Sequence, residues 1–330
     1  MSKLRLTMAC WNYDRTRALA DGRVPVEGVE LNYLDMPVEE TFFRMLRHRE
    51  FDVAEMSLSS YVLSLFQPEP PFIAIPVFPS RAFRHSAIFV NGRSGITAPR
   101  DLIGKKVGLP EYQLTANVWI RGILEEQYGV PAASVRYFTG GQETPGRGEK
   151  LNLQLPPEFR VERIAPDRTL AAMLASGEID AFYGPRTPST FYSQPEAVTR
   201  LFQDFKAVEQ DYFRKTRIFP IMHTVVIRRD IYEGHRWVAQ SLCKAFVEAQ
   251  RLTYDDLIET SALKTTLPWL VAHVEETRGL MGHEFWPYGV GPNRATLETF
   301  LRYSRQQGLA KTVLNVEQLF APETLESFTI

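Results

Sequence analysis

Arginine side chains that follow strand-like runs are the clearest chemical signal in the sequence. Arg15 comes directly after the first such run, and Arg81 and Arg84 lie between two later ones. Arg186 follows a further run in the second half of the chain. Because the guanidinium fork matches the geometry of carboxylates, these positions predict an acid substrate with more than one carboxylate. The alternative for each arginine is an ordinary surface ion pair.

Hydroxyl and amide side chains lie where two predicted strands run into helices. Ser57 ends the run 52–57 and Ser59 follows it, and Thr115 and Asn117 open a helix after the run 106–109. Free backbone N–H groups at a helix start bind anions, so we expect these four residues to help to bind the substrate. Simple helix capping is the alternative explanation.

Three of the six histidines occupy connections beside aromatic and proline residues, where a partly buried imidazole could transfer protons. These are His85, His223 and His283. The other three lie in charged or amphipathic helical contexts and are interpreted as surface or core-edge residues. We take His85 and His223 as the candidates for general acid and base. The histidine spacing shows no metal triad, although separated histidines could converge in space.

The elements that must position these residues alternate between strand-like and helix-like runs, which is typical of an α/β fold. Apolar runs are found at 4–10, 29–35, 52–57, 72–78 and 86–90, and a helix is expected from Thr115 to Tyr128, ended by Gly129. A return strand is expected near 218–230 and a long helix from Tyr232 to about 256.

A length of 330 residues favours two domains, at roughly 150 residues per domain. We predict that the first lobe contains residues 1–92 and 218–330, and that residues 93–217 form an inserted second α/β lobe. The ligand is expected in a cleft between the two lobes.

Composition excludes several classes of protein. The 38 basic and 39 acidic residues give a formal charge of -1, which argues against a nucleic-acid partner. No GxSxG, HExxH, CxxC or phosphate-loop motif is present. No run is long and apolar enough for a membrane span, the N-terminus lacks a signal-peptide pattern, and the two cysteines fit a reducing compartment. We therefore expect a cytoplasmic protein.

Five segments resemble the 4,5-dihydroxyphthalate decarboxylases, a family related in fold to the type II periplasmic solute-binding proteins. They are YDRTRAL at 13–19, EMSLSSYV at 55–62, PVFPSRAFRH at 76–85, DLIGKKVGLPEYQLTANVWIRG at 101–122 and FWPYGVGPNRATLETFLRY at 285–303. The resemblance covers nearly the whole chain. It implies a two-lobed periplasmic-binding-protein-like fold and a carboxy-lyase that converts 4,5-dihydroxyphthalate to protocatechuate and CO2 in phthalate degradation.

The chemistry of that substrate suggests a mechanism. Direct loss of CO2 would leave an aryl carbanion, whereas protonation of the carbon that bears the carboxylate, assisted by the para hydroxyl, avoids it. His85 and His223 would then be acid and base, and the arginines and hydroxyls would hold the two carboxylates. No organic cofactor is needed.

Two alternatives stay open. One is decarboxylation through a divalent metal held by histidines and Glu111, which makes Glu111 a third catalytic candidate. The other is a non-catalytic binding protein for an aromatic or dicarboxylic acid. The expected partner is a small aromatic dicarboxylate, with neither nucleic acid nor membrane, and a homo-oligomer is left open.

Overall fold

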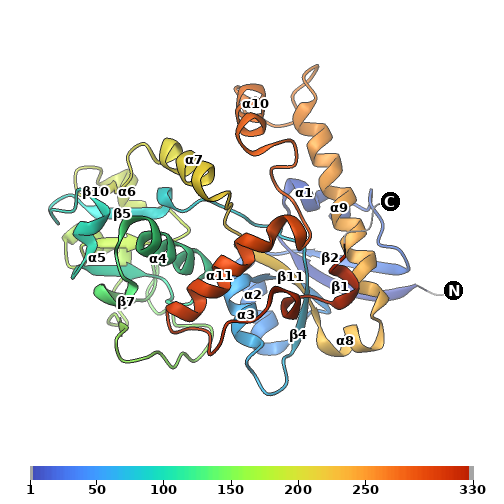
Figure 1. Cartoon of the computed structure of the whole chain (residues 1–330), viewed down its shortest axis with the longest axis horizontal. Coiled ribbons are helices and arrows are strands. Elements are labelled where there is room, and N and C mark those ends of the chain that lie inside the picture. The colour runs from blue at the N-terminus through green and yellow to red at the C-terminus, as the bar shows by residue number, and fades with distance from the viewer. Residues whose placement is uncertain (1–2, 327–330) are drawn as a thin grey trace. The chain divides into compact units, whose positions relative to one another are not determined.

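The computed structural model describes residues 3–326 and divides them into two units, each built on its own sheet (Figure 1). The first unit contains residues 3–81, 223–297 and 314–326, and the second contains residues 82–222 and 298–313. The polypeptide therefore passes repeatedly from one unit to the other, so that each unit combines segments that are distant in sequence.

The first unit contains a mixed five-stranded sheet. Its strands, in spatial order, are β2 (Val29–Asp35), β1 (Leu4–Cys10), β3 (Val53–Ser57), β11 (His223–Arg228) and β4 (Phe72–Ile75). Strand β1 runs parallel to β2 and β3, whereas β11 runs antiparallel to both β3 and β4. All five residues of β3 are buried, as expected for a central strand covered on both faces.

Helices cover this sheet and supply most of its apolar partners. They are α1 (Asp14–Ala20), α2 (Val38–His48), α3 (Leu58–Ser64), α8 (Arg229–Gly234) and α9 (Trp237–Ile258). A further helix, α10 (Leu270–Met281), contacts α9 and is mostly exposed. The main core joins strand residues such as Met8 and Val225 to α1 and to the buried face of α9, including Leu242 and Phe246. No helix within residues 3–326 is long and apolar enough to cross a membrane.

The second unit contains a six-stranded sheet. Its spatial order is β10 (Val198–Arg200), β5 (Ile88–Asn91), β9 (Ala181–Tyr183), β6 (Lys106–Leu109), β7 (Arg136–Thr139) and β8 (Arg160–Arg163). Its helices are α4 (Thr115–Tyr128), α5 (Leu170–Ser176), α6 (Ser189–Ser193) and α7 (Phe205–Thr216). Helix α11 (Arg294–Gln306) begins in the first unit and ends in the second.

The structure confirms the predicted strand 106–109 and the predicted helix 115–128, whose C-terminal Gly129 adopts a left-handed φ of 68°. Strand β11 begins only at His223, and the predicted long helix is divided into α8 and α9. The difference arises because His235 leaves the helical conformation, with φ -147° and ψ 61°, so that α8 ends before it and α9 begins at Trp237.

Two of the predicted domain boundaries need correction. Strand β5 was assigned to the first lobe, yet it pairs with β9 and β10 in the second sheet. Residues 298–313 were also assigned to the first lobe, yet they pack in the second unit, where Gln307 accepts a hydrogen bond from buried Arg121 at 2.8 Å. Both errors concern pairings between residues far apart in sequence.

We predict that Gly122→Ala destabilises the protein. A Cβ at Gly122 would lie 2.1 Å from the nearest atom of the Tyr303 ring, and overpacking of this kind costs about 1–3 kcal/mol. Urea unfolding measures the loss. Gly279→Ala in α10 is the matched control, because apart from its chain neighbours and the backbone of its own helix no atom of residues 3–326 lies within 4 Å of the added Cβ, and alanine favours a helix. Equal stability of Gly122→Ala and wild type would contradict the packing described here.

Candidate active site

The most distinctive polar group of the first unit is Glu55, a carboxylate that is completely buried in β3. Its Oε1 lies 2.6 Å from His223 Nδ1 and accepts a hydrogen bond of 2.7 Å from the Tyr13 hydroxyl. Its Oε2 accepts from the Trp11 backbone N–H at 3.2 Å and from Cys10 Sγ at 3.6 Å. Both carboxylate oxygens are therefore occupied, as a buried charge requires.

The sheet register explains why Glu55 and His223 meet. Glu55 is directly opposite Val225 in the antiparallel pair of β3 and β11. His223 is two residues from Val225, so it lies on the same face of the sheet as a diagonal neighbour of Glu55. Strand β1 ends at Cys10 beside β3, and Tyr13 caps α1 directly after it.

The electrostatics of the cluster favour an ionised Glu55. Burial alone would raise the pKa of this carboxyl, but the charge and hydrogen bond of His223 and the hydrogen bonds from Tyr13 and Trp11 outweigh it, so the pKa is lowered. Burial raises the pKa of the Tyr13 phenol, and the Glu55 charge raises it further. Tyr13 is thus a neutral hydrogen-bond donor to a negative acceptor.

His223 leaves its second ring nitrogen available. Its side chain is 17% exposed, and within residues 3–326 Nε2 has no hydrogen-bond partner. The ring edge of Phe42 packs against it with centroids 4.9 Å apart. With Nδ1 facing a carboxylate, Nε2 is the nitrogen that can exchange a proton with a ligand.

Arg15 is held rigidly next to this pair. Its guanidinium lies between two aromatic rings, 4.3 Å from the centroid of Tyr13 and 4.2 Å from that of Trp286. Nε donates to the Pro79 carbonyl at 2.6 Å, and Nη1 donates to Asp14 at 2.9 Å. Nη2 has no partner in the part of the chain that the structure describes, so Arg15 retains one nitrogen for an anion.

Three other predicted binding residues of the first unit are buried. Ser57 and Ser59 lie at the start of α3, and Arg81 is hydrogen-bonded to the Asn293 side-chain oxygen. Burial lowers the pKa of Arg81 to about 9. Asn293 in turn donates to the carbonyls of Pro287 and Gly289 at 2.9 and 2.8 Å, so Arg81 helps to anchor the loop that carries Trp286.

Glu111 lies in the second unit at the centre of a different charged cluster. Arg147 donates to its Oε1 at 2.7 Å, Lys150 Nζ also contacts Oε1, and the Lys150 backbone N–H donates to Oε2 at 3.1 Å. Burial raises the pKa of the nearby Glu149 to about 7. These contacts tie the segment 147–150 to the start of α4.

The remaining predicted residues of the second unit occupy varied positions. Thr115 and Asn117 are buried in the first turn of α4, where Asn117 donates to the Glu111 carbonyl at 3.0 Å. Burial lowers the pKa of Arg84 to about 10. Arg186 is exposed.

His85 lies in an aromatic environment of the second unit. Its ring centroid is 5.2 to 5.9 Å from those of Phe202, Tyr212 and Tyr128, and neither ring nitrogen has a hydrogen-bond partner among residues 3–326. Burial lowers its pKa to about 4. Although His85 and His223 have similar sequence contexts, only His223 faces a carboxylate.

Sequence reasoning placed Glu55 and Tyr13 within segments 55–62 and 13–19 but assigned neither of them a role in the site. The available signal for Glu55 was one acid inside an otherwise apolar buried strand, which is rare unless the charge is paired. Tyr13 carried no comparable signal. Within residues 3–326 no group of three or more His, Cys, Asp or Glu could hold a metal ion. Glu111 pairs with the side chains of Arg147 and Lys150 and not with a histidine.

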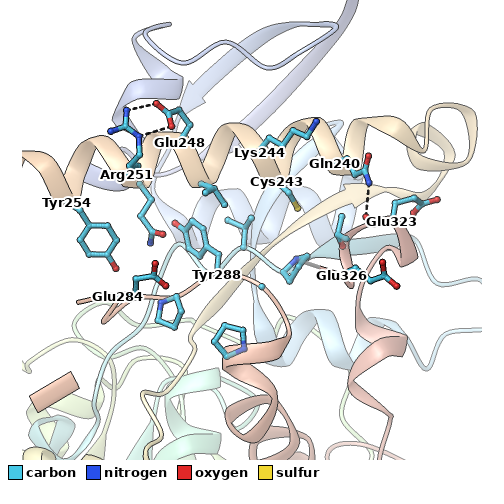
Figure 2. Close-up of a pocket in the computed structure, with 18 residues that line it drawn as sticks. Gln240, Cys243, Lys244, Glu248, Arg251, Tyr254, Glu284, Tyr288, Glu323 and Glu326 are labelled. Atoms are coloured by element: carbon cyan, nitrogen blue, oxygen red, sulfur yellow. Dashed lines mark hydrogen bonds and ion pairs between the residues drawn. The ribbon is translucent and has the colours of Figure 1, made fainter. Parts of the chain in front are cut away.

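A separate cavity of about 510 Å³ lies along α9 in the first unit (Figure 2). Its wall includes Tyr254, Tyr288 and Gln250, and none of the residues predicted from sequence lines it. Tyr254 and Gln250 hydrogen-bond the backbone N–H and carbonyl of Trp286 at 3.0 and 2.8 Å. The cavity wall thus supports the ring that covers Arg15.

Comparisons with known proteins complete the description of the site. The chain is 43% identical over 330 residues to a 4,5-dihydroxyphthalate decarboxylase of Comamonas testosteroni, covering all of both chains. It is 47% identical over 214 residues to one of Pseudomonas putida, covering 65% of this chain and 83% of that one. No family model matches.

Solved structures share the fold at low sequence identity. The periplasmic aliphatic sulphonate binding protein SsuA from Escherichia coli is 14% identical with a TM-score of 0.53, covering 98% of this chain and 99% of that one. The desulfurization enzyme DSZB bound to biphenyl-2-sulfinic acid is 16% identical with a TM-score of 0.52, covering 98% of both chains. The predicted two-lobed periplasmic-binding-protein-like α/β fold is thereby confirmed, whereas the predicted cleft between the lobes stays a prediction.

The environment of His85 predicts a pH-dependent loss of stability. The folded-state pKa of His85, about 4, lies below the usual 6.5. The contribution of the neutral imidazole to the free energy of unfolding is therefore complete above pH 6.5 and is lost as the pH falls toward 4. The shift corresponds to a loss on the order of 3 kcal/mol. Urea unfolding between pH 7 and pH 4 should show a smaller decrease for His85→Leu than for wild type. The exposed His48 provides the control, since His48→Leu should show the same decrease as wild type. If His85→Leu also lost as much stability between pH 7 and pH 4 as wild type, the account would be refuted.

Proposed function

The chain belongs to the 4,5-dihydroxyphthalate decarboxylase family, and we propose that its own substrate is 4,5-dihydroxyphthalate, which it converts to protocatechuate and CO2. Family membership makes it a carboxy-lyase. The observation that carries the proposal is the pairing of buried Glu55 with His223, close to Arg15, whose Nη2 has no partner among residues 3–326. These groups provide an acid and an anion-binding donor, which this reaction needs.

The chemical step that we propose is protonation of the ring carbon that bears the departing carboxylate. Adding the proton interrupts aromaticity, and the para hydroxyl oxygen donates electrons to stabilise the resulting cation. Breaking the bond to the carboxylate then releases CO2 and restores the aromatic ring. The net reaction consumes one proton per turnover, so it requires one acid and no organic cofactor.

His223 is the acid in this proposal. Its Nε2 faces away from Glu55 and can deliver the proton, while the carboxylate stabilises the imidazolium that supplies it. Solvent restores the proton after each turnover. We assign His85 to packing in the second unit, because its ring contacts aromatic side chains and its low pKa keeps it neutral near pH 7.

Arg15 binds the carboxylate that the product retains. The two rings fix the guanidinium plane, and the contacts with Pro79 and Asp14 occupy Nε and Nη1. Nη2 therefore offers a charge-assisted hydrogen bond to one carboxylate oxygen. A substrate with adjacent carboxylates can be held by one of them while the other departs.

Assaying CO2 release from 4,5-dihydroxyphthalate, with and without chelator, tests the function. We expect equal rates in both conditions and one equivalent of protocatechuate. Loss of activity with chelator would support the metal-dependent alternative. Tight binding of the substrate without CO2 release would identify a binding protein. We also propose that the enzyme acts in the cytoplasm, because both cysteines are free, as in reducing compartments.

Replacing the proposed acid should slow the chemical step specifically. We predict that His223→Gln lowers kcat by about 10² to 10⁴-fold and changes KM less than threefold, because Arg15 remains in place. Steady-state kinetics on folded protein measure both constants. His283→Gln is the control, since His283 is exposed. A wild-type kcat for His223→Gln would remove His223 from the mechanism.

Replacing the anion-binding arginine should weaken substrate binding instead. We predict that Arg15→Gln raises KM by about 10 to 100-fold, as expected when a charge-assisted contact is lost. The matched control is Arg17→Gln, because Arg17 is an exposed arginine of the same helix. Isothermal titration with substrate under slow-turnover conditions gives a second estimate of affinity. Equal affinities of Arg15→Gln and Arg17→Gln would exclude the predicted contact.

A further inference from the structure

Tyr13 touches both halves of the proposed site. It precedes α1 as the N-cap residue, and its backbone N–H donates to the Thr16 hydroxyl at 3.1 Å. Thr16 is completely buried and donates in turn to the Trp11 carbonyl at 3.1 Å. The backbone of Tyr13 is thus fixed by local hydrogen bonds, so the direction of its side chain is set by the start of the helix.

The Tyr13 hydroxyl acts on the proton-transfer half. It donates to Glu55 Oε1, the same oxygen that faces His223 Nδ1. This hydrogen bond is one of the contacts that lower the pKa of Glu55. Without it, the carboxylate would lose one of the two donors on that oxygen, and it would be free to rotate away from the imidazole.

The Tyr13 ring acts on the anion-binding half. It covers one face of the Arg15 guanidinium at 4.3 Å, and Trp286 covers the other at 4.2 Å. Cation–π contacts on both faces fix the plane of the guanidinium. They thereby set the direction of Nη2, the nitrogen left for a ligand.

From these contacts we infer that Tyr13 is a positioning residue that couples the proton donor to the carboxylate-binding arginine. Its hydroxyl orients Glu55 and, through it, His223, whereas its ring orients Arg15. The inference rests on the proposed function for the roles of His223 and Arg15. The inference adds that the single side chain of Tyr13 orients both residues, and that the effect of its hydroxyl can be separated from the effect of its ring.

Tyr13→Phe separates them, because it removes the hydroxyl and keeps the ring. We expect kcat to fall about tenfold, the loss typical of one hydrogen bond to a charged group, while KM stays within twofold. The acidic limb of the kcat profile should move to higher pH. Loss of the Tyr13 hydroxyl raises the pKa of Glu55. The Glu55 carboxylate of the variant is therefore protonated at a higher pH than in wild type, and its interaction with His223 is lost at that higher pH.

Trp286→Leu is the complementary variant, because it removes the other ring from Arg15 and leaves Glu55 untouched. We expect KM to rise several-fold with no movement of the acidic limb. Tyr33→Phe is the control for loss of a nearby hydroxyl, since the Tyr33 hydroxyl bonds the Trp11 carbonyl and Thr16 and makes no hydrogen bond to Glu55. It should keep wild-type kcat, KM and pH profile.

A measurement without turnover distinguishes failure of this inference from failure of the proposed function. In ¹⁵N-histidine-labelled protein, the Nδ1–H signal of His223 reports its hydrogen bond to Glu55 and should disappear when Glu55 is protonated. Tyr13→Phe should lose this signal at higher pH than wild type, Trp286→Leu and Tyr33→Phe. An unchanged midpoint in Tyr13→Phe, or an equal displacement in Trp286→Leu, would overturn the inference whatever the substrate proves to be.

Discussion

The structure of the first unit is organised around one buried charge. Glu55 is completely buried in a central strand, and an isolated carboxylate in that position would be severely destabilising. Four donors from two segments of the chain satisfy it: the imidazole of His223, the hydroxyl of Tyr13, the backbone N–H of Trp11 and the thiol of Cys10. Removing any one of them leaves part of the charge uncompensated.

This requirement connects the sheet to the chemistry. The carboxylate fixes Nδ1 of His223 and leaves Nε2 for a ligand, and the tyrosine that supports the carboxylate also stacks on Arg15. Trp286 covers the other face of Arg15 and is itself held by Tyr254 and Gln250 of α9. Elements distant in sequence therefore position one acid and one cation. Preorganised groups of this kind stabilise charge as it develops in a transition state.

Local sequence signals predicted the fold class and several elements, because a signal such as Gly129 lies next to the helix that it ends. The sheet assignment of β5 required partners about a hundred residues away, and the periodicity of one segment carries no such information. The same limit affected the site. His85 and His223 have similar neighbours in sequence, but one packs among aromatic rings and the other faces Glu55 across a sheet register.

A double-mutant cycle with Glu55→Gln and His223→Gln tests the central claim that the two residues act as one unit. The measured quantity is kcat for 4,5-dihydroxyphthalate in wild type, both single variants and the double variant, each corrected for folded protein. If Glu55 acts only through His223, the double variant should be within about threefold of His223→Gln alone, because residues that act together lose their effect together. Losses that multiply, so that the double variant is slower by the product of both single effects, would contradict the account.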